Sequence, residues 1–236
     1  MPLRRPSVVL PVVADKVFIF NLSDCRTLRN LGIFGVLSGT LSKAPQQNLF
    51  LGLPLQLSFN EVCWLVENEY GVLVDGYNYL TVETSAFHKE DPVSMEYTED
   101  LEIIHGSEKF KVITLENFIR MQGLSLEALR ELLLRYHTFR EVKRRGYCIL
   151  PGLRFGGELL AYPGDPLRYH SHLIINTCNK SINILDLISG GRLATSVKKV
   201  WVINQVEDDV LDENGKPKDY SLIRNKSFSI EWAGFG

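Results

Sequence analysis

The segment 154–172, R-F-G-G-E-L-L-A-Y-P-G-D-P-L-R-Y-H-S-H, constrains the fold of this chain more than any other stretch of its sequence. An apolar run ends at Tyr162, the turn residues Pro163-Gly164-Asp165-Pro166 follow, and a second strand-like run contains His170. Proline, glycine and aspartate favour tight turns, so the segment predicts two neighbouring strands joined by a turn. Tyr162 then lies just before the turn, and His170 follows it by eight residues.

The remainder of the second half alternates helix and strand signals around this segment. Leucines at helical spacing, an acidic first turn and three basic residues in the last turn predict a helix over 125–145. A second helix is expected over 184–196, and strands are expected at 147–150, 200–203 and 227–232. We therefore predict an α/β domain with a mixed sheet and one crossover helix.

The first half predicts a smaller unit of mixed α/β structure. Strands are expected at 17–20, 33–37, 49–57 and 72–74. Ser58 and Glu61 form the S-x-x-E pattern of a capping box, which opens a helix. Residues 85–109 are acidic and carry few large apolar side chains, as linkers do. The expected organisation is an N-terminal domain over 1–84, a polar linker over 85–112 and a second domain over 113–236, together of the α/β (α+β) class.

The composition is that of an ordinary globular domain. Hydrophobic residues make up 45% and charged residues 23% of the 236 residues, which is enough apolar content for a sizeable core. No apolar run approaches the roughly 20 residues that a membrane-spanning helix needs. The four cysteines are widely spaced, and no pair has metal-ligand spacing, so we expect free thiols.

Charge is distributed unevenly along the chain. The formal net charge is only −2, but residues 138–204 hold ten Lys/Arg against four Asp/Glu, whereas residues 205–236 hold four against seven. A basic segment inside an acidic chain is what an RNA-binding face requires. An ordinary solvated surface gives the same pattern, so charge alone leaves the two interpretations open.

Three side-chain types in the basic segment could act together in one reaction. A tyrosine, a histidine and a lysine together can deprotonate a hydroxyl, protonate a leaving group and neutralise charge on a phosphate, as a nuclease working without metal requires. His170 and His172 are two apart in an expected strand, so both should point to one face, where they could also be metal ligands. No third ligand stands out near them, and the sequence predicts neither a metal nor a cofactor. Taken singly, each of these residues has an ordinary structural explanation.

The local sequences decide between these explanations. Y-P-G-D-P-L-R-Y-H-S-H, preceded by R-F-G-G and followed by G-R-L-A-T-S-V-K-K, closely resembles the smaller catalytic subunit of the eukaryotic tRNA-splicing endonuclease. V-L-S-G-T-L and Q-Q-N-L-F-L-G-L-P-L resemble the N-terminal domain of that subunit, and F-S-I-E-W-A-G-F-G resembles the C-terminus of its budding-yeast members. The resemblance covers about residues 17–75 and 125–236. It implies a catalytic domain with a restriction-endonuclease-like fold.

The resemblance assigns a catalytic triad of Tyr162, His170 and Lys199. Tyr162 is the expected general base on a ribose 2′-hydroxyl, His170 the acid that protonates the departing 5′-oxygen, and Lys199 the charge that stabilises the transition state. The products are expected to be a 2′,3′-cyclic phosphate and a 5′-hydroxyl. An ordinary tyrosine has a pKa of about 10, so a tyrosine base needs a cationic neighbour, for which Lys199 and Arg168 are the candidates.

The same resemblance implies RNA contacts and protein partners. Arg168, Arg192 and Lys198 are the expected RNA-binding residues, and Arg192 resembles an arginine that stacks on a bulged base in archaeal relatives. The substrate is expected to be an intron-containing pre-tRNA cut at the 3′ splice site. The expected partners are a second catalytic subunit and two structural subunits, the smaller of which pairs with the strand 227–232. The implied location is the nucleus or, in budding yeasts, the mitochondrial surface.

Three other functions are possible for a chain of this kind. A non-catalytic structural or RNA-binding subunit of the same complex should lack the triad, yet all three members are present. A metal-dependent nuclease of restriction type needs an acidic residue followed by an acidic-x-Lys pattern. Asp165 could be the first element, but no such pattern occurs in 173–203. An RNA-binding module without catalysis should show several aromatic platforms, and Tyr169 and Trp201 are too few.

Overall fold

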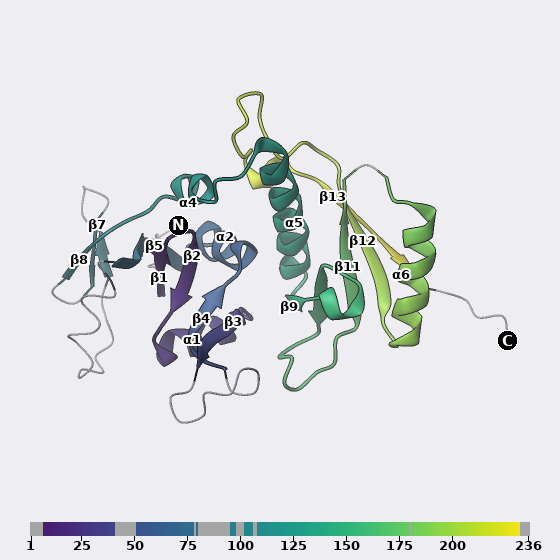
Figure 1. The fold of residues 1–236 in the computed structure, drawn as a ribbon, viewed down its shortest axis with the longest axis horizontal. Helices are drawn as coiled ribbons and strands as arrows, with labels where there is room; N and C mark the ends of the chain where they lie inside the picture. Colours follow the sequence, from purple (N-terminus) through teal and green to yellow (C-terminus); the bar gives the residue numbers. More distant parts are fainter. Residues whose placement is uncertain are drawn as a thin grey trace. The chain divides into compact units, whose positions relative to one another are not determined.

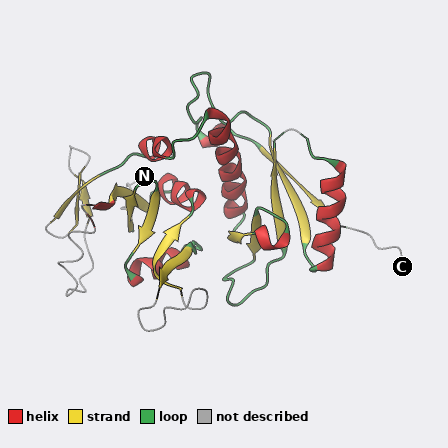
Figure 2. Cartoon of the chain, viewed as in Figure 1, coloured by secondary structure: helices red, strands yellow, loops and turns green. Residues whose placement is uncertain are grey.

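The structure is a computed structural model of the 236-residue chain, and its chain folds into two compact units, Met1–Gly123 and Leu124–Gly236. It describes residues 7–40, 51–77, 79, 95–97, 102–105, 108–179 and 181–231. The ribbon in Figure 1 and the colouring by secondary structure in Figure 2 show helices and strands in both units. No helix in these described ranges is long and apolar enough to cross a membrane.

The first unit is built on a five-stranded mixed sheet. Its strands are β1 (Val8–Val13), β2 (Lys16–Ile19), β3 (Val36–Thr40), β4 (Leu51–Leu57) and β5 (Gly71–Asp75), in the order β3-β4-β2-β1-β5. β1 and β5 are parallel, and the other neighbours are antiparallel. The sequence did not predict β1, which lies inside the sheet between β2 and β5 and is almost wholly buried. Its run of Val and Leu fits a strand buried on both faces.

Helices α1 (Leu22–Asn30), α2 (Phe59–Glu67) and α4 (Leu115–Met121) complete this unit. The capping box that opens α2 is confirmed: Ser58 accepts a hydrogen bond from the Glu61 backbone, and Glu61 accepts one from the Ser58 backbone. Glu61 does more than cap the helix. Its second carboxylate oxygen accepts the backbone N–H groups of Phe34 and Gly35 at 3.1 and 2.9 Å, so one buried side chain connects α2 to the loop before β3.

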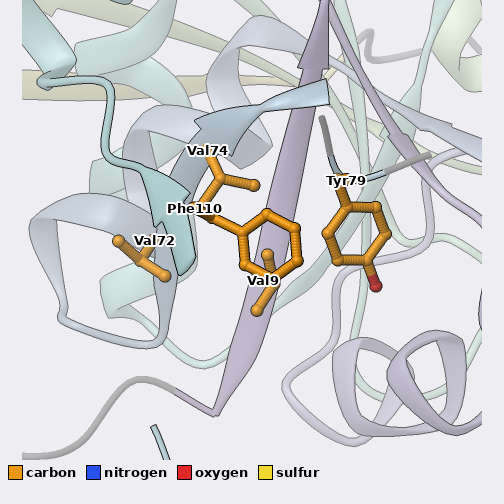
Figure 3. Packing of buried hydrophobic residues seen from close by; sticks show 5 residues of the cluster. All are labelled: Val9, Val72, Val74, Tyr79 and Phe110. Atoms are coloured by element: carbon orange, nitrogen blue, oxygen red, sulfur yellow. The ribbon is translucent and has the colours of Figure 1, made fainter. Parts of the chain in front are cut away.

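A second, three-stranded sheet in the order β6-β7-β8 occupies part of the segment expected to be a linker. Its strands are β6 (Met95–Tyr97), β7 (Glu102–His105) and β8 (Glu108–Lys111), all antiparallel. Phe110 is buried with Val9, Val72, Val74 and Tyr79 in one cluster (Figure 3). Burial of a phenylalanine contributes about 1.5–3 kcal/mol, so Phe110 stabilises the packing of β8 within the first unit.

Helix α4 also belongs to the first unit, whereas the sequence placed residues 113–123 in the second domain. Phe118 is buried and stacks on Phe59 with ring centroids 6.0 Å apart. The side-chain amide of Gln122 donates to the carbonyl oxygen of Asp15 at 3.0 Å. These contacts join residues far apart in sequence, so the local pattern that a sequence offers does not reveal them.

The second unit contains a five-stranded mixed sheet of order β13-β12-β11-β10-β9. Its strands are β9 (Cys148–Pro151), β10 (Leu159–Tyr162), β11 (Leu173–Cys178), β12 (Val200–Val206) and β13 (Asn225–Ile230). Only β11 and β12 are parallel, and α6 (Ile184–Ser196) connects them as the predicted crossover helix. Helices α5 (Leu126–Arg144) and α6 lie on opposite faces of the sheet (Figure 1). The predicted fold class is confirmed.

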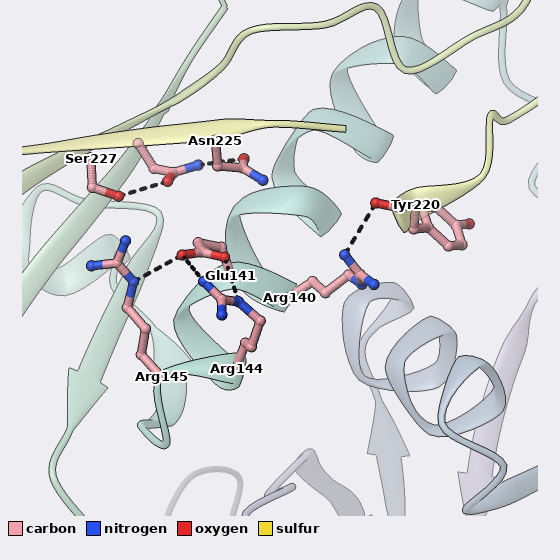
Figure 4. Close-up of polar contacts among 8 residues, drawn as sticks. Arg140, Glu141, Arg144, Arg145, Tyr220, Asn225 and Ser227 are labelled. Carbon is pink, nitrogen blue, oxygen red and sulfur yellow. Dashed lines mark hydrogen bonds and ion pairs between the residues drawn. The ribbon is translucent and has the colours of Figure 1, made fainter. Parts of the chain in front are cut away.

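Each face of this sheet has its own character. Trp201 and Ile203 of β12 are buried with Leu160, Ile174 and Ala194 on the side of α6. On the side of α5, Asn204 donates to the hydroxyl of Thr138 at 3.0 Å and to the side chain of Asn225 at 3.1 Å. Ser227 of β13 also donates to the side chain of Asn204, and Figure 4 shows Ser227 and Asn225 together with the arginines that bind Glu141 and Tyr220. Satisfied buried polar groups of this kind fix the register of neighbouring elements.

Candidate active site

Tyr162, Lys199 and the loop that carries His170 lie at one end of the second sheet, where three chain segments run side by side. Ala161 pairs with Leu173 across β10 and β11, and Leu173 pairs with Val200 across β11 and β12. The ladder extends one step further, because His172 donates its N–H to Ala161 at 3.0 Å and accepts that of Val200 at 2.9 Å. Tyr162 and Lys199, which flank these pairs, therefore lie on either side of the loop that carries His170.

Lys199 is held in this arrangement by two contacts. Its Nζ donates to the backbone carbonyl of Ser171 at 2.8 Å and lies 5.1 Å from the ring centroid of Phe155. Partial burial lowers the pKa of the Lys199 ammonium group, whereas a carbonyl acceptor and an aromatic face both favour its charged form. The cation is thus fixed one residue away from His170.

The turn between α6 and β12 directs Lys199 into the site. Lys199 donates its backbone N–H to Ala194 at 2.9 Å, and Lys198 donates to Thr195 at 3.1 Å, which is the hydrogen-bond pattern of a Schellman motif. Lys198 takes the left-handed residue position of that motif, with φ +55°, where glycine is usual. The structure therefore gives Lys198 a backbone role, and its side chain is exposed.

Residues 163–172 form an ordered loop, and here one prediction is wrong. His170 and His172 do not lie in a strand, because β11 begins at Leu173, after both of them. Asp165 organises the loop instead: its carboxylate accepts the N–H of Leu167 at 2.9 Å, and its carbonyl accepts those of Arg168 and Tyr169 at 2.8 and 3.0 Å. The local turn centred on Asp165 competes with strand formation, so β11 begins only at Leu173. Both histidines are exposed.

Tyr162 is half-buried at the end of β10. Its side chain packs against the apolar cluster under α6, and Phe155, which contacts Lys199, packs against the same cluster. Tyr162 and the ring that supports the Lys199 cation therefore share one side of the sheet. This arrangement places a phenol and an ammonium group beside a loop with an exposed imidazole, which is a complete set for general acid–base chemistry at a phosphate.

The three predicted RNA-binding residues are all exposed, but they lie on different elements. Arg168 is exposed on the loop that carries His170, Lys198 is exposed next to Lys199, and Arg192 is exposed on α6. Sequence reasoning missed Phe155 and the carbonyl of Ser171. Phe155 does lie within the R-F-G-G motif, but a backbone carbonyl leaves no signal in a sequence.

Acidic and metal-binding side chains do not gather at this end of the sheet. Within the described ranges, no group of three or more His, Cys, Asp or Glu side chains is close enough together to hold a metal ion. The four cysteines are free thiols. Burial raises the pKa of the Cys63 thiol, which lies inside α2 of the first unit.

Comparison with known protein families identifies the class to which each unit of the chain belongs. Residues 132–213 match the family model "tRNA intron endonuclease, catalytic C-terminal domain". Residues 8–76 match the model "TSEN34-like, N-terminal domain". The first match covers β9 to β12 with Tyr162, His170 and Lys199, and the second covers the sheet β1 to β5.

Two yeast relatives resemble the chain over nearly its whole length, and an archaeal relative resembles part of it. The tRNA-splicing endonuclease subunit SEN34 of Saccharomyces cerevisiae is 30% identical, over 92% of this chain and 98% of its own. The probable tRNA-splicing endonuclease subunit sen34 of Schizosaccharomyces pombe is 32% identical, and the match covers 95% of this chain and 96% of the length of that relative. The tRNA-splicing endonuclease of Methanopyrus kandleri is 33% identical over 75 residues, 31% of this chain and 42% of its own. This chain belongs to the SEN34 family of tRNA-splicing endonuclease subunits.

Proposed function

We propose that this chain is the subunit that cleaves intron-containing pre-tRNA at the 3′ splice site, with no divalent metal in the chemical step. Tyr162 accepts the proton of the ribose 2′-hydroxyl, whose oxygen attacks the adjacent 3′-phosphate. The bond from phosphorus to the 5′-oxygen breaks, and His170 gives that oxygen its proton. The products are a 2′,3′-cyclic phosphate and a 5′-hydroxyl, so atoms and protons balance without a water molecule.

The observation that carries this proposal is the hydrogen bond from Lys199 to Ser171. It fixes a cation next to the loop of His170, at the end of the sheet where β10 delivers Tyr162. Preorganised charge directed at a phosphate is often the largest contribution to such a reaction. The membership of the chain in the SEN34 family supports the substrate class.

Sulfur substitution tests the role of His170. A 5′-oxygen is a poor leaving group and must gain a proton, whereas a 5′-sulfur leaves as a thiolate. In the assembled endonuclease, His170→Ala should slow the 3′ cut at least about 100-fold. A 5′-phosphorothiolate at that bond should bring the variant close to the wild-type rate, and it should not rescue Lys199→Ala.

The same experiment separates the alternatives. A His170→Ala enzyme that still binds pre-tRNA but gains nothing from sulfur has another acid, and His172 is then the next candidate. Wild-type cleavage should persist in high monovalent salt with excess chelator. Loss of cleavage that returns only with added divalent metal would support the metal-dependent nuclease instead. A 3′ cut that stays at the wild-type rate after substitution of all three residues would make this chain a structural subunit.

We further propose that β13 joins this chain to the smaller structural subunit. In the described part of the chain, β13 pairs on one side only, with β12, which leaves its other edge open to a strand of a partner. Phe228 is 50% exposed on this strand, which is unusual for a phenylalanine in a sheet with two covered faces.

Truncation and a point variant test this contact. Deletion of residues 227–236 should release the small subunit in a pull-down from the assembled complex, and Phe228→Ala should weaken its retention. The neighbouring exposed Ser229 offers a matched control, because Ser229→Ala keeps the backbone edge and removes little surface. Retention of the partner at unchanged affinity after the deletion would show that the subunit binds elsewhere.

A further inference from the structure

The loop 163–172 presents apolar and aromatic side chains to solvent beside the candidate acid. Leu167 is 83% exposed and Tyr169 is 52% exposed, and His170 follows directly. Single exposed apolar side chains are common on protein surfaces, but an aromatic ring exposed beside a reaction centre is also available to stack on a substrate. The polar chemistry proposed for the site does not use either residue.

Tyr169 is held in place although it is exposed. Its ring lies so close to Gly164 that a Cβ atom at that position would be 2.8 Å from the ring. Its backbone N–H donates to the carbonyl of Asp165, which also accepts the N–H of Arg168. The ring therefore has one supported side and a fixed backbone, and it loses little conformational freedom when something stacks on it.

Cleavage by a 2′-hydroxyl sets a geometric requirement that such a ring can help to meet. The attacking oxygen, the phosphorus and the leaving oxygen must be in line, and a regular stacked helix does not hold them so. At least one nucleotide at the cut must therefore leave the stack, and unstacked bases in RNA are commonly received by aromatic side chains. The aromatic face contributes about 1–3 kcal/mol per base and accepts every base.

We propose that Tyr169 is a stacking platform for the base of the nucleotide on the 3′ side of the scissile bond. This inference rests on the proposed function and adds a substrate contact to it. His170 protonates the 5′-oxygen of that nucleotide, and Tyr169 is its immediate neighbour, with Cα atoms about 3.8 Å apart. Tyr169 would thus stack on the base of the same nucleotide whose 5′-oxygen is protonated by His170. Arg168, on the other side of Tyr169, is available to the adjoining phosphate.

An abasic substrate tests the contact directly. In the assembled endonuclease, Tyr169→Ala should lower kcat/KM of the 3′ cut about 5- to 150-fold, the rate equivalent of one stacked base. Tyr169→Phe keeps the ring and should remain within about twofold of wild type, whereas Tyr169→Leu should behave like alanine. With an abasic nucleotide on the 3′ side of the bond, wild type and Tyr169→Ala should cut at the same rate. An abasic nucleotide on the 5′ side should leave their difference unchanged.

Two further variants show that the effect belongs to the ring. Gly164→Ala should displace the ring and slow the natural substrate, yet have no added effect in a Tyr169→Ala background. Tyr77, a 66% exposed tyrosine of the first unit, is the matched control, and Tyr77→Ala should cut normally.

The outcomes of this experiment are separable from those of the sulfur experiment. A wild-type complex that cuts the 3′ site but shows equal losses from Tyr169→Ala on normal and abasic RNA would overturn the platform and leave the proposed reaction standing. A difference that vanishes with the 5′ abasic substrate instead would place the base on the wrong side of the bond and overturn the assignment. Failure of the wild-type complex to cut at all would concern the proposed function itself.

Discussion

The ammonium group of Lys199 donates to the carbonyl oxygen of Ser171, 2.8 Å away and 28 residues earlier in the chain. One hydrogen bond thus joins the end of the crossover turn to the loop of His170. Because Ser171 is buried, its carbonyl has little access to water and needs this donor. This one bond therefore ties down the loop of His170 and also fixes the position of the Lys199 ammonium group.

Loss of the Lys199 cation should affect chemistry more than binding. Lys199→Ala should slow the single-turnover 3′ cut about 100- to 1,000-fold, the usual effect of removing one preorganised charge or donor at the transition state. Lys199→Arg should recover part of the rate, because it keeps the charge but not the geometry. Lys111→Ala, an exposed lysine of the first unit, is the control. A Lys199→Ala enzyme with a normal saturating rate and a raised KM would show that Lys199 only binds RNA.

Lys198 should be replaceable by residues that tolerate its backbone conformation. Its φ of +55° suits glycine and asparagine, whereas a β-branched residue there is strained by about 1–2 kcal/mol. Lys198→Gly and Lys198→Asn should keep the saturating rate of the 3′ cut, and Lys198→Val should lower both stability and rate. Chemical denaturation and single-turnover kinetics measure the two effects. Equal rate losses for asparagine and valine would point to the charge of Lys198 rather than its conformation.

His137 should make the protein less stable in mild acid. Its ring is 1% exposed on α5, neither ring nitrogen has a partner among the described residues, and Tyr136 and Tyr220 pack against it. Burial, with a smaller effect from the Arg140 charge, lowers the pKa of His137 from 6.5 to about 4. The unfolded chain therefore takes up this proton more readily than the folded chain does between pH 6.5 and 4.

The sign of the effect follows from this difference. Stability that is fully present above pH 6.5 is lost as the pH falls towards 4, by up to about 3 kcal/mol at 1.36 kcal/mol per pKa unit. His137→Phe should remove this part of the pH dependence. Urea unfolding at pH 7.5 and pH 5 measures it, as the difference between wild type and variant. Equal losses of stability in the two proteins would assign the acid sensitivity to other groups.

Glu61 should be the most sensitive carboxylate of the first unit. It is 6% exposed and accepts hydrogen bonds from the backbones of Phe34, Gly35 and Ser58 and from the Ser58 hydroxyl. Glu61→Gln puts an NH₂ group opposite one set of donors, so it should lower the free energy of unfolding by about 1–3 kcal/mol. Glu116→Gln weakens an exposed ion pair with Arg120 and should cost less than about 0.5 kcal/mol. Similar costs for both changes would mean that the hydrogen bonds of Glu61 contribute little to the stability of the fold.

The sequence by itself determined the elements whose signals are local. The helix predicted over 125–145 is α5, that predicted over 184–196 is α6, and Ser58 caps α2 through Glu61 as its spacing indicates. Helical periodicity and caps act between residues three or four apart, so the chain carries them in its order. The motif around Tyr162 and His170 is also contiguous in the sequence, and its resemblance to a known family identifies it, although a turn centred on Asp165 replaces the predicted strand at the two histidines.

Only the tertiary structure decided where distant residues meet. The insertion of β1 between β2 and β5, the burial of Phe110 from the predicted linker and the packing of Phe118 on Phe59 all join segments separated by many residues. The contact of Lys199 with Phe155 and with the carbonyl of Ser171 is of the same kind. Such contacts depend on the register of the sheets and on backbone carbonyl and N–H groups. Because these backbone groups are the same at nearly every residue, no local pattern of side chains shows which of them will be used.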